Sequence, residues 1–213
     1  MPLFKTIQPF NHTHIYVWEI EESYSSLLEG ITLTKRSEKR LLSMKSELHQ
    51  RGFLSVRHLL KEAGYSDTDL FYNDHGKPFL IDGKHISITH SYTFAAIIIS
   101  TEEVGIDIEK NREKIKIIQH KFVNFERGFI HKNDNYIEQL TVIWGAKESL
   151  YKIYPYGGLT FKNDIDIASF KISSGQTTGY INVEDWQKMY EIFFEQFEGF
   201  TLVYAIDTGN NAI

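Results

Sequence analysis

The sequence predicts a mixed α+β fold. The chain has 213 residues, of which 42% are hydrophobic and 24% charged, so it can bury a sizeable core and does not have the composition of a disordered protein. Each half of the chain contains one long helix-like segment and several strand-like segments. A boundary is expected near residues 100–104, which gives an amino-terminal subdomain of residues 1–103 and a carboxy-terminal subdomain of residues 104–213.

In the first half, periodicity predicts one strand and one long helix. Residues 14–20 alternate apolar and polar side chains, which is typical of a strand with one buried face. Residues 48–63 place apolar side chains three and four positions apart and precede Gly64, which predicts a helix that ends there. The apolar positions of this helix are Phe53, Val56, Leu59 and Leu60.

A turn and two further strands follow this helix. Residues 73–76, Asn-Asp-His-Gly, separate two short apolar segments and predict a hairpin or tight turn. Strands are expected at residues 86–89 and 94–100, and a short polar connection of residues 90–93 joins them.

The second half repeats this mixture of elements. A strand is expected at residues 104–109, and residues 115–129 are predicted to be irregular or to form short helices. Residues 134–153 are the clearest helix, which ends before Pro155 and a pair of glycines. The remaining strands are expected near residues 165–172, 179–183, 191–197 and 201–206.

Composition excludes several classes of protein. The chain has no cysteine, so disulfides, thiolate metal sites and a cysteine nucleophile are ruled out. No apolar run reaches the ~18–20 residues that a membrane span needs. The first residues do not have the pattern of a secretory signal. We therefore expect a cytoplasmic protein that binds no membrane.

Charge is distributed unevenly along the chain. The net charge of −5 and the pI near 6.0 argue against a nucleic-acid binder. Residues 35–62 nevertheless contain eight basic and three acidic side chains, so this segment carries +5 and the rest of the chain −10. Charge alone is compatible with a solvated helix face and with a local anion-binding site.

Two acidic residues share one face of the strand expected at residues 104–109. Asp107 and Glu109 point to one side of that strand, while Ile106 and Ile108 point to the other. Two carboxylates placed in this way repel each other unless a cation lies between them, and Mg²⁺ or Mn²⁺ suits such oxygen ligands. A solvent-facing edge strand is the structural alternative.

A third acid and a lysine share one face of the later helix. Glu148 and Lys152 are four residues apart and lie on the same face as Trp144. An exposed ion pair is one interpretation. The other interpretation makes Glu148 a metal ligand or a base, and makes Lys152 the cation that neutralises a nearby phosphate oxygen.

Together these segments resemble a known family. The strand Gly-Ile-Asp-Ile-Glu at residues 105–109, followed about 35 residues later by Trp-Gly-Ala-Lys-Glu-Ser-Leu-Tyr-Lys at residues 144–152, resembles the paired motifs of the 4′-phosphopantetheinyl transferases. The resemblance is to the surfactin-synthetase-activating type. Gly-Lys-Pro at residues 76–78 is similar to a family turn, and Thr-His-Ser at residues 89–91 is similar to the Ser-His-Ser end of a family strand. The resemblance spans residues 35–161.

The resemblance implies a fold, an activity and its reactants. It implies two similar α/β subdomains related by a pseudo-twofold, with the active site in the cleft between them, and it favours a monomer. The implied reaction transfers the 4′-phosphopantetheine arm of coenzyme A to a serine of an apo acyl carrier protein or peptidyl carrier domain and releases adenosine 3′,5′-bisphosphate. Mg²⁺, or Mn²⁺, is the implied cofactor. The alternative is a non-catalytic protein that keeps the fold and binds coenzyme A or a carrier protein.

The matched motifs imply the site residues. Glu148 is implied to help deprotonate the serine, and Lys152 to stabilise the departing oxygen, so both are catalytic. Asp107, Glu109 and Glu148 are the implied metal ligands. The implied coenzyme-binding residues are Lys39, Arg51, Lys77, Thr89, His90, Asp107 and Lys152.

Four positions depart from the family pattern or have two interpretations. Thr89 replaces the more usual serine. Leu42 stands where related chains often have a second lysine, and this departure implies weaker binding of the 3′-phosphate. Glu126 resembles a family acid, but a helix cap or a salt bridge also explains it. Arg57 lies in the helix expected at residues 48–63, where solvation is the simple explanation.

An apolar stripe follows the first acidic motif. Its members are spaced three and four residues apart, which is typical of a core. The family places its carrier-binding surface near this region, so the resemblance implies that an exposed part of the stripe meets a carrier helix. Neighbouring basic residues would attract an acidic carrier. The stripe consists of Phe122, Phe125, Phe129 and Ile130, and the basic residues are Lys121, Arg127 and Lys132.

Overall fold

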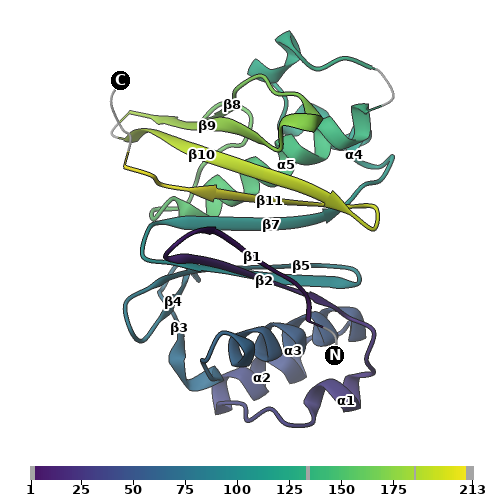
Figure 1. The fold of residues 1–213 in the computed structure, drawn as a ribbon, viewed down its shortest axis with the longest axis vertical. Coiled ribbons are helices and arrows are strands. Elements are labelled where there is room, and N and C mark those ends of the chain that lie inside the picture. The colour runs from purple at the N-terminus through teal and green to yellow at the C-terminus, as the bar shows by residue number, and fades with distance from the viewer. Residues whose placement is uncertain (1–2, 133–134, 185, 210–213) are drawn as a thin grey trace. The chain divides into compact units, whose positions relative to one another are not determined.

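The computed structural model describes residues 3–132, 135–184 and 186–209, and it divides the chain into two compact units, Met1–Thr101 (unit 1) and Glu102–Ile213 (unit 2). Each unit is an antiparallel sheet with one long helix packed against it (Figure 1). The α+β class predicted from the sequence is therefore confirmed. Within the three described ranges, no helix is both long enough and apolar enough to cross a membrane.

Unit 1 contains a six-stranded sheet in the order β1-β2-β6-β5-β4-β3, and each recorded pairing is antiparallel. The strands and the hairpin expected in this half are present, with Gly76 in the left-handed region at φ +81°. The sequence does not predict β1 because neither of its faces is fully buried, so its apolar alternation is weak. The strands are β1 (Leu3–Phe10), β2 (Thr13–Glu19), β3 (Leu70–Tyr72), β4 (Pro78–Leu80), β5 (His85–Ser91) and β6 (Phe94–Ser100).

One long helix, α3 (Glu47–Glu62), covers a face of this sheet, and its bounds agree with the prediction to within one residue. Gly64 follows the helix at φ +84°. The four predicted core positions of α3 are no more than 4% exposed: Phe53, Val56, Leu59 and Leu60. The other helices of the unit are α1 (Tyr24–Leu28), α2 (Lys35–Ser43) and the short 3-10 helix η1 (Asp67–Asp69).

Arg57 is buried, so the expectation of a solvated side chain is wrong for this residue. Its Nε donates to Asp67 Oδ1 at 3.0 Å, and its Nη2 donates to the Ser37 hydroxyl at 3.3 Å. Asp67 also accepts from the backbone N–H and the hydroxyl of Thr34, the residue that caps α2. Burial raises the pKa of Asp67, but these hydrogen bonds and the charge of Arg57 outweigh burial and lower it. The ion pair therefore joins α2, α3 and η1.

Unit 2 contains a five-stranded antiparallel sheet in the order β7-β11-β10-β9-β8, with helix α5 (Tyr136–Ile153) packed on one face. The predicted helix begins at Asp134, which lies outside the described residues. The strand expected at residues 165–172 ends earlier than predicted, because residue 172 belongs to a 3-10 helix. The strands are β7 (Val104–Lys110), β8 (Ile165–Ile167), β9 (Gln176–Val183), β10 (Trp186–Phe197) and β11 (Phe200–Ile206). The short helices are α4 (Ile115–Ile118), η2 (Gln119–Lys121), η3 (Phe125–Gly128) and η4 (Ile172–Ser174).

The two units share one topology. In unit 1, β2 leads into the long helix α3 and then into β3, β4, β5 and β6, which lie in the spatial order β2-β6-β5-β4-β3. In unit 2, β7 leads into α5 and then into four strands with the equivalent order β7-β11-β10-β9-β8. Strand β1 is an additional edge strand of unit 1. The chain thus contains two similar halves. That residues 1–103 bind the coenzyme A phosphates and residues 104–213 carry the metal and catalytic motifs remains a prediction.

Candidate active site

The acidic motif and the later helix motif of unit 2 meet because two glycines allow a close approach. A Cβ atom at Gly105 of β7 would lie 2.0 Å from the backbone oxygen of Ser149 in α5, so only glycine fits there. A Cβ atom at Gly145 of α5 would lie 2.7 Å from Val203 Cγ2 of β11. Gly105 and Asp107 share a face of β7, so Asp107 also faces α5.

Lys152 of α5 is bonded to the first acid of β7. Its ammonium donates to Asp107 Oδ1 at 2.9 Å and to the backbone oxygen of Ile106 at 2.7 Å. Asp107 is only 6% exposed. The ion pair that the structure shows is therefore Lys152–Asp107 between helix and strand, and not an exposed Glu148–Lys152 pair along the helix.

Glu148 has a strongly raised pKa. Burial raises its pKa to about 7, the negative charges of Asp107 and Glu109 act in the same direction, and the positive charge of Lys152 opposes them. The four side chains thus form one electrostatic group at the contact between β7 and α5. A carboxyl group with a pKa near 7 can exchange a proton with a substrate at neutral pH.

The donor chemistry of this group fits a hard cation, although its present arrangement is not that of a formed metal site. Among the side chains that the structure describes, no group of three or more His, Asp or Glu residues is placed to hold a metal ion. The Lys152 ammonium already bonds to Asp107. A divalent cation suits carboxylate oxygens, and it would offset the repulsion by Asp107 and Glu109 that adds to burial in raising the pKa of Glu148. The metal-ligand role of Asp107, Glu109 and Glu148 therefore stays a prediction.

A second lysine of the helix motif, Lys147, is fully buried, and the sequence analysis gave it no role. It forms an ion pair with Glu126 at 2.7 Å and donates to the backbone oxygens of Phe122 and Phe161. Burial lowers the pKa of Lys147, and the charge of Glu126 opposes this shift. The salt-bridge interpretation of Glu126 is thus the one that the structure shows. The position of Lys147 in the sequence indicated that it is buried, because it lies one helical turn from the apolar residues Ile143 and Leu150 of α5.

In unit 1, helix α3 meets β5 at the predicted coenzyme-binding residue His90. A Cβ atom at Gly52 would lie 2.9 Å from both Cγ and Nδ1 of the His90 ring. The ring of His49, one helical turn before Gly52, has its centroid 6.1 Å from that of His90, and the sequence analysis did not identify it. Thr89 is buried and points to the opposite face of the strand, so its hydroxyl does not share the exposed surface of His90.

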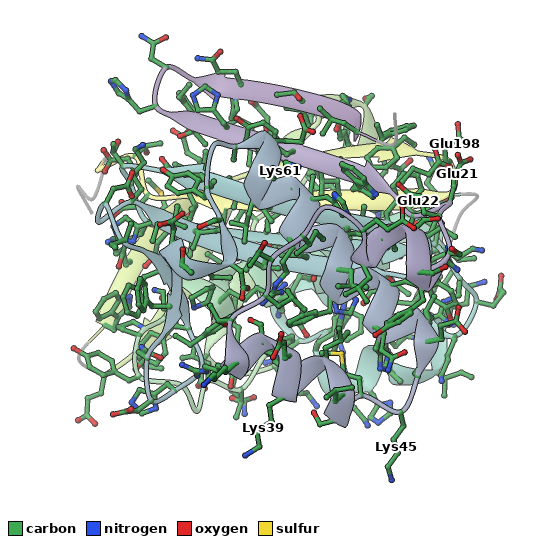
Figure 2. The ribbon with its side chains drawn as sticks, turned by 90° about the horizontal axis from the view of Figure 1, so that it is seen from below. Glu21, Glu22, Lys39, Lys45, Lys61 and Glu198 are labelled. Atoms are coloured by element: carbon green, nitrogen blue, oxygen red, sulfur yellow. The ribbon has the colours of Figure 1, made fainter. Side chains whose placement is uncertain are left out.

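The other predicted coenzyme-binding residues of unit 1 come from separate elements. Arg51 is half-buried on α3 and donates its Nη2 to the backbone oxygen of Ile20 at 2.9 Å. Lys39 is exposed on α2, and its side chain extends away from the ribbon (Figure 2). Lys77 lies at the end of the hairpin turn, where its backbone N–H donates to Asn73 Oδ1 at 2.9 Å.

The +5 segment of residues 35–62 does not form one continuous charged surface. Figure 2 shows Lys39 and Lys45 extending from the same edge, with Lys61 well apart from them. The guanidinium groups of Arg36 and Arg40 lie over the ring of Tyr72, 5.3 and 5.4 Å from its centroid. Arg57 is neutralised by Asp67. Leu42, where a second lysine was the family expectation, is 79% exposed.

The apolar stripe of unit 2 is mainly core. Phe122 is fully buried against Trp144, with ring centroids 5.2 Å apart, and Phe129 and Ile130 pack partly against the same core. Phe125 is different, because it is 58% exposed on η3. Ile117 of α4, which the sequence analysis did not single out, is 71% exposed.

A cavity in unit 2 lies away from this chemistry. It has a volume of about 560 Å³, and its lining includes Lys171, Thr178 and Glu191 of the η4, β9 and β10 region. The described lining contains none of the predicted site residues. The acids and lysines of β7 and α5 are therefore the stronger candidate for the active site.

Comparison with known proteins points to the same segment of the chain. Residues 103–205, nearly all of unit 2, match the family model of the 4′-phosphopantetheinyl transferase superfamily. The 4′-phosphopantetheinyl transferase gsp of Aneurinibacillus migulanus is 32% identical over 132 residues, which are 60% of this chain and 54% of that protein. Enterobactin synthase component D of Salmonella typhimurium is 32% identical over 115 residues, which are 50% of this chain and 47% of that protein.

The chain spans about half the length of the curated relatives it matches. The matched segment contains both motifs of the candidate site, on β7 and on α5. This segment therefore matches the 4′-phosphopantetheinyl transferase superfamily, in agreement with the resemblance inferred from the motifs.

Gly105→Ala is expected to disrupt unit 2. The added methyl group would meet the backbone of α5, which cannot move aside as a flexible side chain can, so we expect a loss of about 3 kcal/mol or more in the free energy of unfolding. Urea unfolding followed by circular dichroism measures this change. The matched control is Gly128→Ala, whose Cβ atom meets nothing within 4 Å. Equal stability of the two variants would contradict the close-contact argument.

Glu148→Gln is expected to stabilise the protein at high pH when EDTA is present. The pKa of Glu148 rises from its ordinary value of 4.5 to about 7 on folding, so ionised Glu148 opposes folding progressively as the pH rises between these values. The variant lacks this penalty, and we expect a gain on the order of 1 kcal/mol at pH 8 that shrinks towards pH 4.5. Urea titrations at several pH values test this, and a gain that does not grow with pH is inconsistent with it.

Proposed function

We propose that the protein transfers the 4′-phosphopantetheine arm of coenzyme A to a serine of an apo acyl carrier protein or peptidyl carrier domain. The observation that carries the proposal is the group on β7 and α5, where Lys152 bonds to Asp107 beside Glu148, whose pKa is about 7. The match of residues 103–205 to the superfamily model supports the same reaction class.

The proposed chemistry is a phosphoryl-group displacement. The serine oxygen forms a bond to the β-phosphorus of coenzyme A, and the bond from that phosphorus to the bridging oxygen breaks. The bridging oxygen leaves with its electron pair as part of adenosine 3′,5′-bisphosphate. Glu148 is the acceptor of the serine proton, and the Lys152 ammonium stabilises the negative charge that develops on the leaving oxygen.

The proposed metal ligands are Asp107, Glu109 and Glu148. Mg²⁺, or Mn²⁺ in its place, would supply positive charge to neutralise the pyrophosphate oxygens when bound. The support is the oxygen-donor chemistry of these side chains and the raised pKa of Glu148, to which burial contributes most and the charges of Asp107 and Glu109 add.

Coenzyme A carries three phosphate groups, which need fixed hydrogen-bond donors and cations. We assign them to Lys39, Arg51, Lys77 and His90, and we leave out Thr89 because its side chain is buried on the opposite face of β5. The support is the exposed position of His90 against Gly52 and the basic character of the other side chains.

The proposed carrier-binding surface consists of the exposed part of the apolar stripe and of Ile117 in α4. Phe125 and Ile117 are exposed apolar side chains of unit 2. Lys121 and Arg127, which flank Phe125 in the sequence, are exposed as well. An acidic carrier helix has the complementary combination of charge and apolar side chains.

To test the transfer reaction, an apo carrier protein is incubated with coenzyme A, Mg²⁺ and this protein. The mass of the carrier is then measured by mass spectrometry. We expect the mass of a phosphopantetheine arm to be added, and we expect EDTA to stop the reaction. Glu148→Gln should lower kcat by about 100-fold or more, because the proton acceptor is lost. Glu198→Gln, at an exposed acid of unit 2, is the control and should retain activity.

A measurement of coenzyme A binding, combined with the mass measurement, separates transfer from simple binding. Calorimetry should show that Glu148→Gln still binds coenzyme A. The non-catalytic alternative would be supported by two results together. The affinity for coenzyme A would be unchanged by Mg²⁺ or EDTA, and no mass would be added to any of several carriers.

Phe125→Ala is expected to weaken recognition of the carrier and to spare recognition of coenzyme A. Removal of an exposed aromatic contact should raise the KM for the carrier by about tenfold and leave the KM for coenzyme A within about twofold. Steady-state kinetics with each substrate varied in turn measures both constants. Ile81→Ala, at a 66% exposed apolar residue of unit 1, is the control and should change neither. An unchanged carrier KM for Phe125→Ala would place the docking surface elsewhere.

A further inference from the structure

The Glu126–Lys147 ion pair is a completely enclosed charge pair in unit 2. Both side chains have no exposed surface, and the two charged groups are 2.7 Å apart. Two charges removed from water in this way require further hydrogen bonds to compensate for lost hydration. The positions of those hydrogen bonds show what the pair holds together.

Each member of the pair binds backbone groups from other segments. Glu126 accepts from the backbone N–H groups of Asn124 and Ile167, both at 3.1 Å, and Ile167 belongs to β8. Lys147 donates to the backbone oxygen of Phe122 at 2.7 Å and to that of Phe161 at 2.8 Å. The pair therefore joins α5 to residues 122–126, to the turn that contains Phe161, and to β8.

The segment of residues 115–128 has little regular structure of its own. It contains α4, η2 and η3, which have four, three and four residues, and the irregular residues 122–124. Helical turns of this length are not stable alone, because each fixes several dihedral angles for few hydrogen bonds. The conformation of the segment thus depends on its contacts with the core, namely the buried ring of Phe122 and the buried carboxylate of Glu126.

Phe125 lies between these two anchors in the sequence and is exposed. Its neighbour Glu126 is fully buried, while Phe125 itself is 58% exposed on the same short helix η3. Because Glu126 is fixed from both sides by Lys147 and Ile167, the direction of η3 is fixed as well. The exposed position of Phe125 is thus a consequence of where Glu126 is held.

We infer that the Glu126–Lys147 ion pair positions the segment of residues 119–128 so that Phe125 is presented to the carrier protein. Glu126 and Lys147 are then positioning residues for carrier recognition, and they contact neither substrate. Lys147 precedes Glu148 in α5, so one helix holds both the docking segment and the proposed proton acceptor. This inference rests on the proposed function, in which Phe125 contacts the carrier.

The chain offers a matched control in unit 1. Arg57 and Asp67 form a second buried ion pair, with a separation of 3.0 Å and side chains 4% and 1% exposed. Asp67→Asn therefore breaks a comparable pair without touching residues 119–128. A purely structural role for Glu126 predicts the same consequences for both pairs, while a positioning role predicts different ones.

The test compares Glu126→Gln, the double variant Glu126→Gln/Lys147→Met and Asp67→Asn with the wild-type protein. The double variant leaves no uncompensated buried charge, so it is the variant expected to remain folded if the single variant does not. Hydrogen–deuterium exchange by mass spectrometry reports on residues 119–128, and steady-state kinetics gives the KM for the carrier and for coenzyme A.

We expect the double variant to show faster exchange in residues 119–128, a carrier KM raised by about tenfold and a coenzyme A KM within about twofold of wild type. Asp67→Asn should leave both the exchange of residues 119–128 and the carrier KM unchanged. Unchanged exchange in the double variant, or a carrier KM that does not rise, would overturn the inference. An equal rise in both KM values, or an equal effect of Asp67→Asn, would also overturn it.

The failure of the proposed function is distinguishable from the failure of this inference. If the wild-type protein modifies no carrier, the proposed function fails, and the exchange data alone decide whether the ion pair holds residues 119–128. If the wild-type protein modifies a carrier and the double variant does so with an unchanged carrier KM, the inference alone fails.

Discussion

The close contact of α5 with β7 and β11 is the constraint on which the candidate active site depends. A side chain at Gly105 would collide with the backbone of Ser149, and one at Gly145 would collide with Val203. With both positions free of side chains, helix and strand lie near enough for the Lys152 ammonium to reach Asp107. The same closeness buries Glu148 next to two other acids, which raises its pKa to about 7.

Each unit contains a buried ion pair between its long helix and a neighbouring connection. In unit 1, Arg57 of α3 pairs with Asp67, which also holds the beginning of α2. In unit 2, Lys147 of α5 pairs with Glu126, which also holds β8. Buried ion pairs contribute little net stability compared with apolar side chains of similar size, but breaking one partner is costly. Their hydrogen bonds select one arrangement of the short segments around each helix.

The fold was largely predictable, whereas the partners of charged side chains were not. The long helices and most strands follow from periodicity because each has a continuous buried face, and β1 escapes prediction because it has none. Spacing along α5 suggested a Glu148–Lys152 pair, yet Lys152 bonds to Asp107 of a strand 45 positions away. Thr89 and His90 are adjacent in sequence but point to opposite faces of β5.

The sequence by itself determined the α+β class and the paired motifs on β7 and α5, because these depend on local periodicity and on residue identity. The tertiary structure alone decided which cation meets which carboxylate, since such pairs form between elements far apart in the chain. It placed Lys147 in the core with Glu126 and left Phe125 exposed beside it. It also paired Arg57 with Asp67, although Arg57 belongs to the segment of residues 35–62 whose summed charge is +5. A buried charge is stable only when an opposite charge compensates for its lost hydration.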